Sequence, residues 1–143
     1  MSKIAVVYWS GTGNTESMAN AIVEGAKEAG ADVELFQVDD FKVADIANYD
    51  GLIFGCPAMG DEVLEEDSFE PFFAEAEAKI SGVPVALFGS YGWGGGAWME
   101  TWAERTRGTG AKLFSDGLIA ENAPDDDVLD ECKALGADFV KSF

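Results

Sequence analysis

Residues 4–15 read IAVVYWSGTGNT, an apolar run followed at once by a loop of glycines and hydrogen-bonding side chains. The apolar run predicts a buried β-strand, and the residues after the loop have the spacing of a helix. A loop between a strand and a helix gathers the free N–H groups of the first helical turn at the positive end of the helix dipole. The stretch therefore predicts an anion-binding turn in an α/β domain, with phosphate as the expected anion.

The loop offers only neutral donors to that phosphate. Its hydrogen-bonding side chains are Ser10, Thr12, Asn14 and Thr15, and no Lys or Arg occurs between residues 4 and 26. The lysine of a Walker phosphate-binding motif is therefore absent. We expect a phosphate bound here to keep its negative charge.

Apolar and β-branched runs recur along the chain and alternate with helical stretches, which predicts repeated β–α units. Three of the runs are almost continuously apolar, as expected of strands buried on both faces of a parallel sheet. The pattern predicts an α/β fold, a three-layer doubly wound sandwich with five parallel strands, in a single domain spanning residues 1–143. The expected strands are 3–8, 32–37, 51–56, 83–89 and about 111–120.

Four helices are expected between and after these strands. The first stops at Gly30, the third ends near Gly108 and Gly110, and the fourth follows Pro124 with three aspartates in its first turn, where acidic charge suits the helix dipole. Residues 38–50 are compatible with either a short helix or an irregular crossover. The inward stripes of the first three helices are Met18, Ile22, Gly25 and Ala29; Phe69, Phe72, Phe73, Ala76 and Ile80; and Trp98, Met99, Trp102 and Ala103.

The chain is strongly acidic. It has 27 Asp and Glu against 9 Lys and Arg, a formal net charge of −18, and no His. Such a surface repels a nucleic-acid backbone and favours a basic protein partner. No apolar stretch approaches the roughly 18 residues of a membrane span, and the first residues lack a signal-peptide core. We therefore expect a cytoplasmic protein without membrane contact.

Cys56 and Cys132 lie far apart and form no Cys-x-x-Cys pair, so neither a redox motif nor a zinc site is expected. Cys132 shares the inward stripe of the last helix with Leu135 and Phe139, which favours core packing. Cys56 ends a strand, and residues 57–60 supply neither a base nor an Arg to activate it as a nucleophile. We expect both thiols to be reduced.

Three loops follow the carboxyl ends of strands, where ligands bind in doubly wound folds. They are residues 9–15, 57–67 and 90–97. Met59 and Trp93 stand on glycine-flanked turns of the second and third loops, where a ligand would cover them. The alternative is that both side chains fill gaps beneath their own loops. Together with the phosphate turn, the loops predict a flat heterocycle with a phosphate tail.

With these loops the chain resembles the flavodoxins, specifically the short-chain type that binds FMN, over essentially all of its length. Residues 10–15 (SGTGNT) match the family's phosphate loop, residues 59–62 (MGDE) its loop beside the reactive edge of the flavin, and residues 90–94 (SYGWG) its stacking loop. The short-chain type is indicated because residues 111–120 lead into Pro124 without an extra excursion. The resemblance implies the sheet order 2-1-3-4-5, non-covalent FMN and a monomer.

The resemblance also implies roles for individual residues. Met59 and Trp93 would cover the two faces of the flavin ring, and Glu62 would accept a hydrogen bond from flavin N3–H. The Gly60–Asp61 peptide would act as a redox switch, turning its carbonyl toward N5–H in the semiquinone. Gly92 and Gly94 would present N–H groups to the pyrimidine edge. The phosphate would be surrounded by Ser10, Gly11, Thr12, Gly13, Asn14 and Thr15, and the remaining expected neighbours are Pro57, Ala58, Ser90 and Tyr91, with Trp9 less defined.

Pro57 departs from the pattern, because similar proteins can have a serine there whose hydroxyl reaches the phosphate. One hydrogen bond to the phosphate is therefore in question.

Acidic residues crowd the loop predicted beside the flavin, and residues 43–78 contain no Lys or Arg. Negative charge opposes the addition of an electron, so we expect a low-potential one-electron carrier that cycles mainly between semiquinone and hydroquinone. The chain would have no substrate of its own and would contact basic surfaces of redox partners transiently. A solvated face remains the simpler interpretation of Glu65, Glu66 and Asp67. The full set is Asp61, Glu62, Glu65, Glu66, Asp67 and Glu70.

Two other classes share this topology. An FMN-dependent quinone reductase would need a substrate pocket, but the chain has no pocket-forming insertion, no His and no paired acid and base. A signalling module of the response-regulator kind needs clustered acids after the first strand, where this chain has Tyr8, Trp9 and Ser10.

Overall fold

The strands form one parallel sheet. The structure is a computed structural model that describes residues 2–11, 13–59, 64–92 and 96–142. Its strands are β1 (Lys3–Tyr8), β2 (Asp32–Gln37), β3 (Gly51–Gly55), β4 (Pro84–Tyr91), β5 (Lys112–Leu113) and β6 (Leu118–Glu121). Their order is β2-β1-β3-β4-β5, and β6 also pairs with β4. The predicted order is therefore confirmed.

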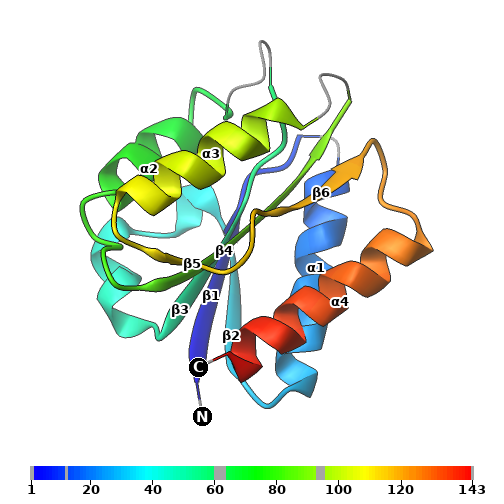
Figure 1. Cartoon of the computed structure of the whole chain (residues 1–143), viewed down its shortest axis with the longest axis horizontal. Helices are drawn as coiled ribbons and strands as arrows, with labels where there is room; N and C mark the ends of the chain where they lie inside the picture. Colours follow the sequence, from blue (N-terminus) through cyan, green and yellow to red (C-terminus); the bar gives the residue numbers. More distant parts are fainter. Residues whose placement is uncertain (1, 12, 60–63, 93–95, 143) are drawn as a thin grey trace.

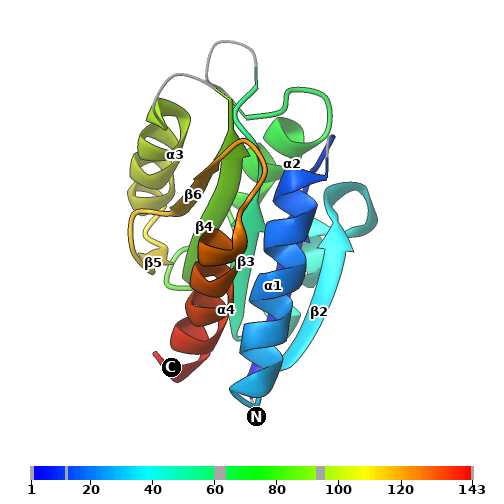
Figure 2. The ribbon, with the colours of Figure 1, turned by 90° about the vertical axis from the view of Figure 1, so that its right-hand side faces the viewer.

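Helices cover both faces of this sheet, which confirms the doubly wound architecture. Figures 1 and 2 show α1 (Asn14–Glu28) and α4 (Asp126–Lys141) on one face, and α2 (Phe69–Ala76) and α3 (Ala97–Gly108) on the other. The ambiguous stretch 38–50 contains two short 3₁₀ helices, η1 (Val38–Asp40) and η2 (Val43–Asn48). Among the described residues, none of the helices has the length and apolar composition needed to cross a membrane.

Side chains of β1 alternate between two separate cores. Ile4 and Val6 pack in the core beneath α1 and α4, whereas Ala5 and Val7 pack in the core beneath α2 and α3. Both faces of β1, β3 and β4 are buried, which explains why these strands read as continuous apolar runs. At the edge of the sheet, β2 has one buried residue, Val33, and its other residues are half-buried or exposed.

The predicted fifth strand is divided in two. β5 pairs with Pro84 and Val85 at the start of β4, and β6 pairs with residues 88–91 at its end. Between them, Ser115 (φ 63°) and Gly117 (φ 104°) adopt left-handed conformations that a β-strand does not contain. The expectation of one continuous strand over about 111–120 was wrong, because these two residues turn the chain away from the ladder.

Helices α1 and α4 touch through backbone at two glycines. A Cβ on Gly25 would lie 1.9 Å from the carbonyl oxygen of Lys133, and a Cβ on Gly136 would lie 2.2 Å from that of Ile22. Real Cβ atoms do not approach so closely, so only glycine permits this contact.

Candidate functional site

A cavity of about 280 Å³ opens beyond the carboxyl ends of β1, β3 and β4. These strand ends lie at the top of the view in Figure 1. All three loops named from the sequence contribute to the cavity, which is the convergence expected of a doubly wound sheet. Backbone hydrogen bonds continue the ladder there, from Trp9 N–H to Gly55 O (3.0 Å) and from Ala58 N–H to Ser90 O (3.0 Å). The described lining residues are Trp9, Gly11, Asn14, Pro57, Ala58, Met59, Ser90, Tyr91, Gly92 and Asn122.

The first loop is folded around Ser10. Its Oγ accepts hydrogen bonds from the N–H groups of Gly13 (3.1 Å) and Glu16 (3.3 Å). Gly13 caps α1 in a left-handed conformation (φ 94°), so no side chain covers the first helical turn at that position. The helix N-terminus thus faces the loop from which Gly11 and Asn14 reach the cavity.

The indole of Trp9 lies close to Gly11 in the same loop. A Cβ on Gly11 would lie 2.9 Å from the indole of Trp9, so glycine lets that ring lie against the loop backbone. The preceding Tyr8 donates a hydrogen bond from its hydroxyl to Glu16 Oε2 (2.9 Å). Burial, together with that bond, raises the pKa of Tyr8 above its ordinary value.

Thr15 and Ser90 form a buried hydroxyl pair. Their oxygens lie 3.1 Å apart, and their exposed fractions are 1% and 5%. The pair joins the first turn of α1 to the end of β4. Ser90 lines the cavity, whereas Thr15, Ser10 and Gly13 do not. Direct contact of these three residues with a phosphate stays a prediction.

Glu65 corrects one expectation. The sequence favoured a solvated position, but its side chain is only 6% exposed. Its carboxylate accepts hydrogen bonds from three backbone N–H groups, those of Asp67 (2.7 Å), Ser68 (2.8 Å) and Phe69 (2.8 Å). The expectation failed because these groups at the start of α2 need an acceptor. The neighbouring Glu66 and Asp67 are exposed, as expected.

Glu70 is ion-paired rather than free. Arg105 donates to both Glu70 carboxylate oxygens at 2.7 Å and also to Glu77 at 2.6 Å. These bonds raise the pKa of Arg105 above its already high value. Glu70 therefore adds less negative charge to the rim of the site than a count of acids suggests.

Cys56 lies directly before the second loop and is fully buried. Burial raises the pKa of its thiol well above the ordinary value, so it is neutral at physiological pH. This agrees with the expectation of an unreactive thiol. Cys132 is buried in the opposite core, as its helical stripe indicated.

Six of the predicted site residues lie outside the described part of the chain. The interpretation of the Gly60–Asp61 peptide as a redox switch, the hydrogen bond to Glu62, the stacking of Trp93 and the N–H of Gly94 stay predictions. These residues are Thr12, Gly60, Asp61, Glu62, Trp93 and Gly94.

The sequence reasoning missed Asn122. It follows β6, lines the cavity in a left-handed conformation (φ 58°) and donates its N–H to Tyr91 O at 2.7 Å. Asparagine tolerates this conformation better than most residues, and its place just after the last strand was the only available signal. The last strand therefore contributes to the site as well as the three predicted loops.

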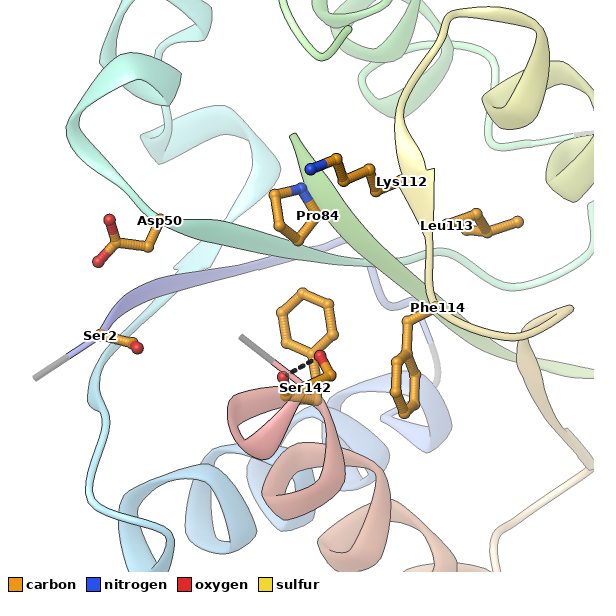
Figure 3. Close-up of a pocket in the computed structure, with 8 residues that line it drawn as sticks. Ser2, Asp50, Pro84, Lys112, Leu113, Phe114 and Ser142 are labelled. Atoms are coloured by element: carbon orange, nitrogen blue, oxygen red, sulfur yellow. Dashed lines mark hydrogen bonds between the residues drawn. The ribbon is translucent and has the colours of Figure 1, made fainter. Parts of the chain in front are cut away.

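A second, larger cavity of about 820 Å³ lies at the amino ends of the strands, on the side of the sheet opposite the first cavity. Figure 3 shows Pro84 and Lys112 on one side of this cavity and Phe114 and Ser142 on the other. Ser142 Oγ donates to Phe139 O at 2.6 Å within this group. None of the three predicted loops reaches this cavity in the described residues, so we place the functional site at the carboxyl edge.

Comparison with known proteins shows which family the chain resembles. A family model described as flavodoxin matches residues 6–136. The chain is 49% identical to a flavodoxin of Megasphaera elsdenii over 142 residues, which cover 97% of this chain and 99% of that protein. It is 54% identical to a flavodoxin of Clostridium beijerinckii over 121 residues, or 85% and 88% of the two chains. The solution structure of two-electron reduced M. elsdenii flavodoxin superposes with a TM-score of 0.89, covering 96% of this chain and 98% of that one.

Proposed function

Because this chain belongs to the flavodoxin family, we propose that it is a low-potential one-electron carrier that binds FMN non-covalently. Members of the family bind FMN and pass electrons to redox partners. The observation that carries the proposal is the cavity beyond β1, β3 and β4, where a helix N-terminus and neutral donors meet apolar side chains. FMN would supply the site with a group that takes up and releases single electrons.

The residues present fit the two ends of FMN. The phosphate would lie at residues 10–15, at the N-terminus of α1, where Gly11 and Asn14 line the cavity. The ring would lie along Met59, with Pro57, Ala58, Tyr91 and Gly92 beside it, and Trp93 would cover its second face. Thr15 would act on this site through its hydrogen bond to Ser90.

Electrostatics support the low potential. Among the described residues that line the cavity there is no Lys or Arg, so an added negative charge meets no basic side chain there. The buried carboxylate of Glu65 stands at the end of the loop that begins at Pro57. The carboxylate opposes the addition of electrons to a bound group, no basic lining side chain offsets it, and the effect grows where water is excluded.

Several basic residues lie near the amino ends of the strands, opposite the cavity. This distribution supports a basic partner at the site. Lys3 and Lys112 begin strands, and Lys27, Arg107 and Lys141 lie in the last turns of helices that run back from the site. The charge distribution orients the acidic, cavity-bearing edge toward a basic surface. The absence of a substrate of its own, the single domain, the monomeric state and the cytoplasmic location stay predictions.

FMN titration tests the proposal. The apoprotein should quench FMN fluorescence with a Kd of about 1 μM or lower, and the complex should be yellow. A reductive titration should then resolve two one-electron steps, the second at the lower potential. Failure to bind FMN would exclude the function, and a single two-electron step would exclude one-electron cycling. Steady turnover of NAD(P)H with a quinone would instead indicate an enzyme.

Alanine at Gly13 should weaken FMN binding about tenfold, because the strained loop would move the N–H groups of the phosphate turn. Gly30 provides a matched control. Both glycines have left-handed φ values (94° and 95°), and a Cβ on either would meet no described atom within 4 Å. Each substitution should therefore destabilise the fold by about 1–2 kcal/mol. Equal FMN affinities in the two variants, measured by fluorescence titration, would contradict the phosphate turn.

Salt should slow electron transfer to a basic redox partner. Raising the ionic strength from about 0.05 M to 0.5 M should lower the bimolecular rate about tenfold, since exposed charges are screened within about 10 Å at 0.1 M. Stopped-flow reduction of a basic cytochrome provides the measurement, and an acidic cytochrome is the control. A rate independent of salt with the basic partner would rule out the acidic docking face.

A further inference from the structure

A contact between Cys56 and Glu65 closes the base of the second loop. The N–H of Glu65 donates to the sulfur of Cys56 at 3.4 Å, and both residues are buried. Eight residues lie between them, and the first three, Pro57, Ala58 and Met59, form one wall of the cavity. The wall is thus fixed at a point away from the cavity surface.

Both ends of this contact are tied to the core. Cys56 donates its N–H to Phe88 O (3.2 Å), and its carbonyl accepts from Trp98 Nε1 (3.2 Å). Glu65 O accepts from Glu70 N–H (2.8 Å), in addition to the three N–H groups that its carboxylate binds. The loop is therefore anchored to β4, α3 and α2 at once.

The carboxylate of Glu65 acts in place of the N-cap side chain of α2. Ser68 is the N-cap residue of α2, but its side chain accepts no capping hydrogen bond. The carboxylate of Glu65, three residues earlier in the chain, accepts hydrogen bonds at this helix start instead. In contrast, α4 is capped by its own Asp125, which accepts from one N–H group, that of Val128. A buried carboxylate is costly unless fully hydrogen-bonded, so its use here indicates a demand for fixed geometry.

The anchor is connected to all three loops of the site. From Cys56 the chain runs to Ala58, whose N–H donates to Ser90 O (3.0 Å). Ser90 in turn shares its hydroxyl with Thr15 in the first turn of α1 (3.1 Å). A displacement at Glu65 would therefore reach both the wall and the phosphate turn.

We propose that Glu65, with Cys56 as its partner, is a positioning residue for the FMN site, holding the Pro57–Met59 wall at the distance that the cofactor requires. The inference rests on the proposed function. In this proposal the buried carboxylate positions the cavity wall. This role is separate from the effect of its negative charge on the reduction potential.

Glu65→Gln tests the role of the carboxylate. The amide would direct an NH₂ group at a backbone donor in place of an acceptor, and we expect the Kd for FMN to rise about tenfold. Glu66→Gln is the control, because it removes the same charge one residue away at an exposed position. Loss of negative charge alone should tighten the binding of anionic FMN. Equal or tighter binding by Glu65→Gln, relative to Glu66→Gln, would overturn the proposal.

Cys56→Ala tests the anchor without changing any charge. We expect weaker FMN binding, by about threefold or more, and a shift in the one-electron potentials, with Cys56→Ser intermediate because its hydroxyl still accepts from Glu65 N–H. Cys132→Ala is the control, since it removes an equally buried thiol from the opposite core. Cys56→Ala with the affinity and potentials of Cys132→Ala would overturn the proposal.

The outcomes separate the two proposals. If the unaltered protein does not bind FMN, the proposed function fails. If it binds FMN and the variants bind equally well, only the positioning role fails. Circular dichroism of each apoprotein reports folding, and if Glu65→Gln does not fold, the Cys56 variants decide the matter.

Discussion

Alanine in place of Gly136 should lower the free energy of unfolding by about 3 kcal/mol. The new Cβ would lie 2.2 Å from Ile22 O and 2.9 Å from Ala26 N, atoms of the α1 backbone that cannot rotate away. Helices α1 and α4 would have to separate, and the core beneath them would lose packing. The gain in helix propensity, about 1 kcal/mol for alanine over glycine, is too small to offset this.

Two further glycines test the cause. Gly25→Ala should lower the free energy of unfolding by a similar amount, because its Cβ would meet Lys133 O on the other side of the same contact. Gly108→Ala, at the end of α3, meets no described atom within 4 Å and should be neutral or stabilising by about 0.5 kcal/mol. Urea denaturation of the three variants provides the comparison. If all three glycines tolerate alanine equally, the close helix contact is wrong.

Raising the pH from 8 to 10 should destabilise the protein by about 2 kcal/mol for each of its two thiols. Burial raises the pKa of Cys132 to about 12 and that of Cys56 further, whereas an unfolded thiol ionises near pH 8.5. Above about pH 8.5 the unfolded state therefore holds fewer protons than the folded state. The free energy of unfolding is therefore unaffected by the thiols below about pH 8.5. It falls as the pH rises from there toward the thiol pKa values of the folded state.

Variants without the thiols separate this effect from other titrations. Cys132→Ala and Cys56→Ala should each remove about half of the loss between pH 8 and pH 10, although both lower stability at neutral pH by leaving small cavities. Tyrosines ionise mainly above this range. The measurement is the urea midpoint at pH 8, 9 and 10. An unchanged pH dependence in the double variant would contradict the neutral buried thiols.

The sheet and its helices could be predicted because burial on both faces leaves a clear sequence pattern. Continuous apolar runs located β1, β3 and β4, and stripes at helical spacing located the four helices. The second helix is shorter than expected, since α2 ends at Ala76 although Ile80 continues its apolar stripe. The stripe reports burial, and Ile80 remains buried beyond the end of the helix.

The site was predictable where short motifs determine backbone geometry. The glycine turn before α1 and the meeting of three loops followed from glycine positions and strand ends. Glu65 and Asn122 could not be found in this way. The role of each depends on partners that the fold supplies, three N–H groups at the start of α2 for Glu65 and Tyr91 O for Asn122.

The division of the fifth strand limits intermolecular pairing at that edge of the sheet. A long, regular edge strand offers a continuous row of unpaired N–H and C=O groups, on which another molecule can add a strand and begin to aggregate. Here β5 has two residues and β6 has four, with a left-handed turn between them. At the other edge, β2 carries Asp32 and Glu34, whose charges repel a second copy of so acidic a chain. Both lateral edges of the sheet are thus poor templates for fibril growth.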